Sequence, residues 1–142
     1  MTQTWLIPID ESETAMKPVE WLLANRALWR EMPQIHLLNV QVSLPRDIGR
    51  FINAETIREF HNDTGTTELQ AATEKLIAAG ITPKTHVLVG EPAATIAKFA
   101  DENHCAQILI GSRGHSGIAG TLLGSVASRV VNLSTVPLLI VR

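Results

Sequence analysis

Five short apolar runs recur along the chain, and each is too brief to form a buried helix. Their near-continuous hydrophobicity, in place of strict alternation, is typical of strands that are covered on both faces of a sheet, which usually means parallel strands flanked by helices. We therefore predict five strands, at Trp5–Ile9, Ile35–Val40, His86–Val89, Ile108–Ile110 and Val136–Val141.

Four segments between these runs repeat apolar residues every three or four positions, the period of an amphipathic helix. They predict helices over Ala15–Glu31, Thr67–Ala79, Pro92–Asn103 and Ser125–Leu133. Ser12 and Thr14 are candidate caps of the first helix. Gly80 suits the left-handed residue that ends the second helix. Residues 43–66 have weaker periodicity, with a short helix near 54–60 as one option, so we expect this region to be the most mobile part of the chain.

Alternation of strands with helices predicts one α/β domain, which the length of 142 residues also suits. Because crossovers between parallel strands are right-handed, this order favours an open, doubly wound parallel sheet with helices on both faces. Ligands bind such sheets beyond the carboxyl ends of the strands, at the switch point in strand order. The loops after Ile9, Val40, Val89 and Ile110 are therefore the places to look for a site.

Composition narrows the function classes further. The chain has 12 Lys and Arg against 14 Asp and Glu, a net charge of −2, which argues against a basic nucleic-acid surface. No run approaches the roughly 20 apolar residues of a membrane-spanning helix, and the first residues lack the pattern of a secretory signal. The single cysteine, Cys105, excludes an intramolecular disulfide framework. We expect a cytoplasmic protein that neither inserts into membranes nor binds nucleic acid.

A cluster of glycines is the strongest chemical signal. Five of the nine glycines fall within residues 111–124, directly after the strand that ends at Ile110 and before the helix that begins at Ser125. Glycine lets backbone N–H groups approach a ligand, and a helix N-terminus attracts anions, so phosphate is the expected occupant. A plain flexible connection is the alternative. Neither a G-x-x-x-x-G-K-[ST] nor a G-x-G-x-x-G motif is present, which disfavours P-loop NTPases and Rossmann dehydrogenases.

The spacing Gly111-Ser-Arg-Gly114, nine residues, then Gly124-Ser125 resembles the G-x2-G-x9-G-[ST] signature of the ATP-binding branch of the universal stress protein family. The resemblance covers essentially the whole chain, including residues 7–12, 90–92 and 136–141. It implies strand order 3-2-1-4-5, bound ATP with Mg²⁺ as an option, and a regulatory role with slow hydrolysis at most. It also implies a homodimer through the last strand, and a regulated protein partner is a further option. An apolar edge strand at Val136–Val141 independently needs a cover for its unpaired backbone groups.

The resemblance also implies roles for particular residues around the nucleotide. Asp10 would face the nucleoside or a metal, while Ser125 would offer a hydroxyl and an N–H group to the phosphates. His115 stands where the family more often has Arg or Lys, which weakens the case for a triphosphate. The full set of expected binding residues is Pro8, Asp10, Val40, Gly111, Arg113, Gly114, His115, Gly124, Ser125 and Val126. For Arg113, exposure to solvent at the tip of the loop is an equally good alternative to a contact with phosphate.

Several residues have a structural alternative. Asp10 and Ser12 both suit helix caps, and His36, inside an apolar strand, is expected to be buried and satisfied by a neighbour. Cys105 is expected to be a small buried apolar residue. The three tryptophans, Trp5, Trp21 and Trp29, are interpreted as core or interface residues. His61, His86 and His104 lack metal-ligand spacing, so no zinc site is assigned.

No hydrolase motif is evident, since the chain has neither a G-x-S-x-G elbow nor a Walker lysine. Binding is therefore favoured over catalysis. Two other hypotheses stay open: an enzyme of the adenine-nucleotide-hydrolase or electron-transfer-flavoprotein type, and an interaction module without nucleotide. In the pyrophosphatase branch of the enzyme hypothesis, a serine- and glycine-rich loop is expected after the first strand. This chain has Asp10-Glu11-Ser12-Glu13 there.

Overall fold

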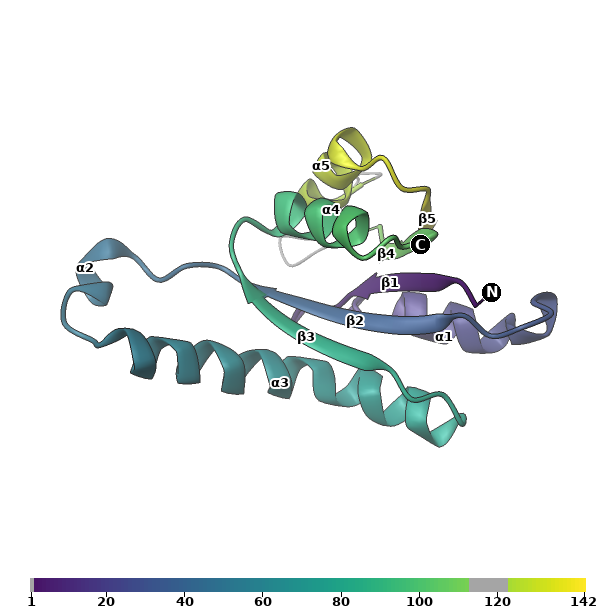
Figure 1. The fold of residues 1–142 in the computed structure, drawn as a ribbon, viewed down its shortest axis with the longest axis horizontal. Helices are drawn as coiled ribbons and strands as arrows, with labels where there is room; N and C mark the ends of the chain where they lie inside the picture. Colours follow the sequence, from purple (N-terminus) through teal and green to yellow (C-terminus); the bar gives the residue numbers. More distant parts are fainter. Residues whose placement is uncertain (1, 113–122) are drawn as a thin grey trace.

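The computed structural model describes residues 2–112 and 123–142 and contains one parallel five-stranded sheet (Figure 1). Its strand order is β3-β2-β1-β4-β5, which confirms the predicted order, and every recorded strand pair is parallel. The strands are β1 Thr4–Pro8, β2 Gln34–Gln41, β3 Lys84–Val89, β4 Gln107–Gly111 and β5 Leu138–Val141.

Helices cover both faces of the sheet, as predicted. α1 and α3 pack on one face, and α4 and α5 pack on the other (Figure 1). The helices are α1 Lys17–Ala24, α2 Arg46–Gly49, α3 Ala54–Ala78, α4 Pro92–Glu102 and α5 Ser125–Leu133, and a 3-10 turn, η1, spans Arg26–Leu28. The predicted bounds of the last two helices agree with the structure to within one residue. Among the described residues, no helix is both long and apolar enough to cross a bilayer.

The central strands face two cores at once, which explains their unbroken apolar sequence. On β1, Leu6 packs into the core under α4 and α5, whereas its neighbour Ile7 packs into the core under α1 and α3. Both side chains are fully buried. Since successive side chains of a strand point to opposite faces, a strand covered on both sides is apolar at most positions. The buried polar exceptions on β2, His36 and Asn39, have hydrogen-bond partners.

The first helix is shorter than predicted. It ends at Ala24, not Glu31, and the chain continues into η1. Asn25 occupies the C-cap position and donates its side-chain amide to the carbonyl of Trp21 at 2.9 Å, which satisfies the end of the helix. The predicted caps are also wrong, because the N-cap is Met16, without a side-chain hydrogen bond.

The helix considered near residues 54–60 is present, and it extends much further than predicted. The expected mobility stays a prediction for the weakly periodic segment 43–66. Most of this segment belongs to α3, which begins at Ala54, where the side chain of Asn53 accepts a hydrogen bond from Thr56 N at 2.8 Å. Gly65, within this weakly periodic segment, lies inside the helix and is buried. A Cβ there would come within 2.5 Å of Val87 Cγ1, so glycine lets α3 approach the sheet closely.

The end of α3 follows the prediction. Gly80 has a φ of 83°, the left-handed conformation that glycine adopts without steric cost. Its N–H donates to Ile77 O at 2.9 Å, and Ile81 N donates to Leu76 O at 2.9 Å, which closes the last turn of the helix.

The three tryptophans come together although they are far apart in the sequence. Trp5 is buried in the core, and its ring centroid lies 4.9 Å from that of Trp29 in an edge-to-face contact. Trp21 contacts Trp29 in the same manner at 5.5 Å. Their interpretation as core residues is confirmed for Trp5, and the other two pack against the same core.

Candidate functional site

A cavity of about 480 Å³ opens at the carboxyl ends of the strands, where the chain crosses from the β1–β2–β3 half of the sheet to the β4–β5 half. This is the switch point at which doubly wound sheets bind ligands. The cavity is lined by Pro8, Ile9, Asp10, Glu11, Ser12, Ala15, Leu38, Val40, Gln41, Val42, Glu68, Pro92, Ile96, Ile110, Gly111, Ser125, Val126 and Ala127.

The backbone of Val40 faces this cavity from the end of β2. The carbonyl of Gln41 accepts from Gly90 N on the β3 side at 2.9 Å, and backbone groups alternate in direction along a strand, so those of Val40 point toward β1. Yet the last register pair between β1 and β2 is Pro8 with Leu38. Beyond it, the carbonyl of Ile9 accepts from the Asn39 side chain at 3.0 Å. The N–H and C=O of Val40 therefore form a donor and acceptor edge directed into the gap beyond β1.

Asp10 follows β1 and closes a turn in addition to lining the cavity. Its Oδ1 accepts hydrogen bonds from Ser12 N at 2.9 Å and from Ser12 Oγ at 2.5 Å. The alternative that Asp10 or Ser12 caps α1 is therefore wrong, since the two residues bond to each other and α1 begins later. Both residues line the cavity, and one oxygen of Asp10, Oδ1, orders the loop.

Glu68 brings a carboxylate to the cavity from α3, and the sequence analysis missed it. Its Oε2 accepts from Asn39 Nδ2 at 2.5 Å and from Gln41 Nε2 at 3.5 Å. Asn39 is 1% exposed and held on its other side by the carbonyl of Ile9. The only sequence signal was the position of Glu68 beside Leu69, on the side of α3 that packs against the sheet.

The N-terminus of α5 lies at the cavity, and its N-cap residue makes no side-chain hydrogen bond to the first turn. The N-cap is Gly124, which has no side chain to accept a hydrogen bond, and Ser125, Val126 and Ala127 of the first turn line the cavity. The first N–H groups of a helix have no partner within the helix and carry a positive partial charge. Gly124 N donates to Ser112 O at 2.5 Å, which holds the start of α5 against the end of β4.

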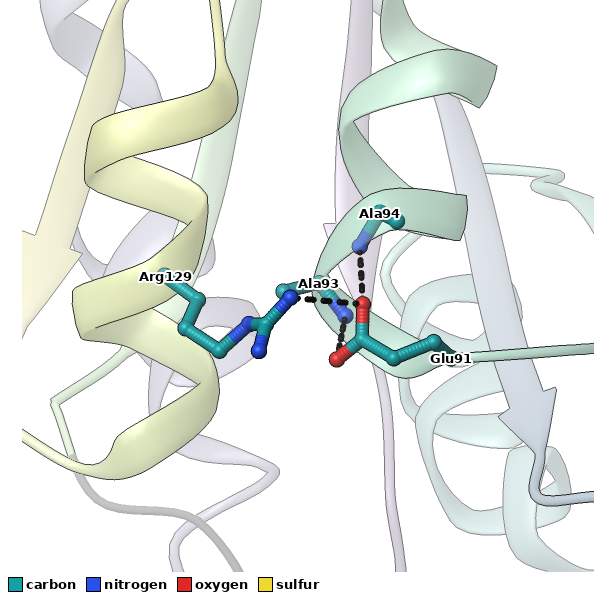
Figure 2. Close-up of polar contacts among 4 residues, drawn as sticks. All are labelled: Glu91, Ala93, Ala94 and Arg129. Carbon is teal, nitrogen blue, oxygen red and sulfur yellow. Dashed lines mark hydrogen bonds and ion pairs between the residues drawn. The ribbon is translucent and has the colours of Figure 1, made fainter.

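The neighbouring helix, α4, has its N-terminus occupied by its own chain. The carboxylate of Glu91 accepts from Ala93 N at 3.3 Å and from Ala94 N at 2.7 Å (Figure 2). The same carboxylate lies 3.5 Å from Arg129 of α5. Of these two helix N-termini, that of α4 is neutralised by a carboxylate, whereas no side chain among residues 2–112 and 123–142 caps that of α5.

Charge is unevenly distributed around the cavity. Asp10, Glu11 and Glu68 place three carboxyl groups on its wall, and the helix N-terminus of α5 supplies positive partial charge. Carboxylates accept hydrogen bonds from hydroxyl and amine groups, whereas a helix N-terminus donates to anions. Such a site suits a ligand with donor groups at one end and an anionic group at the other. Among the described residues, no three His, Cys, Asp or Glu side chains come together as a metal site.

Comparison with known proteins identifies the family of this chain. A family model described as "Universal stress protein family" matches residues 1–142. The chain belongs to the universal stress protein family. Universal stress protein YxiE of Bacillus subtilis is 39% identical over 95 residues, a match that covers 65% of this chain and 64% of YxiE. Universal stress protein MJ0577 of Methanocaldococcus jannaschii is 28% identical over 150 residues, covering 96% of this chain and 93% of MJ0577.

Solved structures of the universal stress protein family share the fold. The structure of MJ0577 matches with a TM-score of 0.80 at 28% identity and covers 99% of this chain and 96% of that one. A universal stress protein in complex with cAMP matches with a TM-score of 0.72 at 25% identity and covers 99% of this chain and 97% of that one. The predicted family and sheet topology are therefore confirmed.

Within the universal stress protein fold, the predicted binding residues that the structure describes do come together. Six of them line the cavity: Pro8, Asp10, Val40, Gly111, Ser125 and Val126. Gly124 lies beside them as the N-cap of α5. Arg113, Gly114 and His115 lie outside the described residues. Their proposed phosphate contacts stay predictions.

Other candidate residues lie away from the cavity. His36 is buried, and its Nδ1 lies 2.9 Å from Nε2 of His86, which confirms that it is satisfied by a neighbour. Burial lowers the pKa of both imidazoles, and the pKa of His36 is lowered further by His86 and Lys84. Cys105 is buried, as expected, and its burial raises the pKa of the thiol.

Proposed function

We propose that this universal stress protein binds ATP in the cavity at the carboxyl edge of the sheet and acts in the cytoplasm as a nucleotide-dependent regulator. The observation that carries the proposal is the pairing, on one cavity, of two backbone features without a hydrogen-bond partner in the part of the chain that the structure describes. Val40 presents a donor and acceptor edge at one position, and α5 presents an uncapped N-terminus at another.

Adenine matches the Val40 edge. Its ring N1 accepts a hydrogen bond and its exocyclic amine donates one, so the N–H and C=O of one extended residue can hold both atoms. Apolar side chains beside this edge, Leu38, Ile96 and Ile110, provide a surface for a flat base. The complex of a relative with cAMP supports an adenine nucleotide as the ligand class.

Phosphates match the α5 N-terminus. Backbone N–H groups of Ser125 and Val126 would donate to the phosphate oxygens, and the hydroxyl of Ser125 adds a further donor. Asp10 would contribute a carboxylate oxygen to Mg²⁺, which usually binds nucleotide phosphates together with one or two protein carboxylates. We expect binding with slow hydrolysis at most, because the described cavity wall holds no lysine or arginine.

Two measurements test this proposal. The first is mass spectrometry of ligand released from protein purified without added nucleotide, in which we expect ATP or ADP. Release of flavin would instead support an electron-transfer-flavoprotein type of activity. The second is titration calorimetry of ligand-free protein with ATP, with inorganic triphosphate as the control for binding by charge alone. Absence of heat with ATP at high micromolar protein would reject the proposed function.

We also propose that two copies pair through β5. This strand lies at one edge of the sheet, and its Leu138, Leu139 and Ile140 side chains are only half-buried within one chain. An unpaired apolar edge strand requires a cover, which a second β5 would supply. Sedimentation velocity at micromolar protein should give a dimer whose mass does not change with concentration. A monomer under these conditions would reject the pairing.

A further inference from the structure

Glu68 is a part of the cavity wall to which the proposed adenine site assigns no role. It reaches the cavity from α3, whereas the other polar wall residues follow the ends of strands or begin α5. The position of Glu68 and the hydrogen bonds of its carboxylate limit which atoms of a bound nucleotide this side chain can contact.

The carboxylate of Glu68 is held beside the backbone edge of Val40. It bonds to Asn39 and Gln41, the residues immediately before and after Val40. Side chains two residues apart on a strand lie on the same face, so both point toward α3, and the Val40 backbone lies between them. Any base that pairs with Val40 therefore has Glu68 as a neighbour.

The hydrogen bonds of this carboxylate involve only one of its two oxygens. Among the residues that the structure describes, the donors to Glu68 are Asn39 and Gln41, and both bond to Oε2. Gln41 is held in turn, because its Nε2 donates to Asn39 Oδ1 at 2.7 Å. Among the described residues no donor bonds to Oε1, so Oε1 can accept a hydrogen bond from a ligand in the cavity that Glu68 lines. A carboxylate in this position favours a donor on the ligand and repels a carbonyl oxygen.

We infer that Glu68 determines base specificity, by accepting a hydrogen bond from the exocyclic amine of adenine and by disfavouring a base with a keto oxygen in its place. This inference rests on the proposed binding of ATP at the Val40 edge. It makes Glu68 a group that distinguishes 6-amino from 6-oxo purines, in addition to the Val40 backbone.

ATP and inosine triphosphate are the matched pair of probes, because they differ only in the 6-amino or 6-oxo group and the proton on N1. Glu68→Gln keeps the size of the side chain. Since Asn39 Nδ2 still needs an acceptor, the amide oxygen of Gln would face Asn39 and its NH₂ group would face the ligand. We expect the ratio of ATP affinity to inosine triphosphate affinity to fall by about tenfold or more.

The ratio, not the affinity, is the measured quantity, because loss of one negative charge strengthens binding of both triphosphates. Glu74→Gln is the control, since Glu74 lies on the same helix, outside this cavity, and bonds to Gln70. It should leave the ratio unchanged. Glu68→Ala, which removes the acceptor without adding a donor, should lower the ratio less than Glu68→Gln does.

Thermal unfolding identifies the folded variants, and the outcomes separate the two hypotheses. A wild-type protein that binds ATP, together with an unchanged ratio in folded Glu68→Gln and Glu68→Ala, overturns the role of Glu68 and leaves the proposed function intact. A wild-type protein that binds neither triphosphate overturns the proposed function itself. A lowered ratio confined to the Glu68 variants supports the inference.

Discussion

The carboxylate of Glu91 lies 3.5 Å from the guanidinium nitrogen of Arg129, and this ion pair joins the start of α4 to α5. The same carboxylate caps α4 by accepting two backbone hydrogen bonds (Figure 2). The two helices that form one layer of the fold thus differ at their N-termini. A charged side chain of the protein satisfies α4, and α5 starts at a glycine that offers no acceptor.

Loss of the α4 cap should destabilise the fold more than loss of the ion pair. Glu91→Ala removes both backbone hydrogen bonds and should lower the free energy of unfolding by about 1 kcal/mol. Arg129→Ala should lower it by about 0.5 kcal/mol or less, because the two side chains are 60% and 46% exposed and water screens the pair. Urea unfolding of both variants tests this order. An equal or larger effect of Arg129→Ala would contradict it.

Placing a carboxylate at the start of α5 should block phosphate binding. Gly124 has an extended backbone, with φ −68° and ψ 167°, that any residue can adopt. In Gly124→Asp the new carboxylate would cap α5 as Glu91 caps α4, with a gain in stability of a few tenths to about 1 kcal/mol. We expect at least about tenfold weaker ATP binding, because one anion then occupies the helix N-terminus.

Gly124→Asn is the matched control, since it provides a cap without a charge. Its ATP affinity should lie between those of wild type and Gly124→Asp in calorimetric titrations. If Gly124→Asp bound ATP as tightly as wild type, the N-terminus of α5 would not be the phosphate site.

A methyl group at Gly65 should destabilise the packing of α3 on the sheet. The new Cβ would lie 2.5 and 2.8 Å from the two methyl carbons of Val87 and 3.0 Å from Asn39 Oδ1. Overpacking of this kind costs about 1–3 kcal/mol, and the better helix propensity of alanine recovers about 1 kcal/mol of it. We expect Gly65→Ala to unfold at a lower urea concentration than wild type.

Gly49→Ala is the control for this substitution. Gly49 is the last residue of α2, and a Cβ there would meet no atom within 4 Å. The free energy of unfolding of this variant should equal or exceed that of wild type. A Gly65→Ala protein as stable as Gly49→Ala would show that α3 can move away from β3 without cost.

The sequence predicted well those elements whose burial leaves a simple periodic pattern. β1 was evident because residues such as Leu6 and Ile7 fill two cores, and α5 was evident from its apolar stripe and the glycine before it. The first turns of α3 were offered only as an optional short helix near residues 54–60, and their continuity with the rest of α3 was not predicted. They run past the edge of the sheet, where side chains such as Phe60 are exposed and no core imposes a period (Figure 1).

The candidate site was predictable only for residues at the end of a strand or the start of a helix. Val40 and Ser125 follow from strand ends and a helix start, which sequence patterns reveal. Glu68 acquires its position from contacts with Asn39, 29 residues earlier, and Gln41, 27 residues earlier. The helix sequence indicates that Glu68 lies near the packed side of α3, beside Leu69, but not which residues of β2 it meets.

Stability should fall in acid because of the pair of histidines on β2 and β3. His36 and His86 stack with ring centroids 5.0 Å apart, and both pack against Phe99 of α4. Burial lowers the pKa of both rings below the ordinary value of 6.5, so the folded state binds protons less readily than the unfolded state. The free energy of unfolding should thus be at its full value above about pH 6.5 and decrease as the pH falls toward the lowered folded-state values.

Urea unfolding at pH 7.5 and pH 5.5 measures this decrease, and His86→Gln identifies its source. Glutamine can still bond to His36 but does not titrate, which removes the contribution of His86 and its repulsion of a protonated His36. The loss of stability between the two pH values should therefore be smaller in the variant. His104→Gln is the control for replacing a histidine by glutamine at an exposed position outside this pair. An equal loss in wild type and His86→Gln would assign the acid sensitivity to other groups.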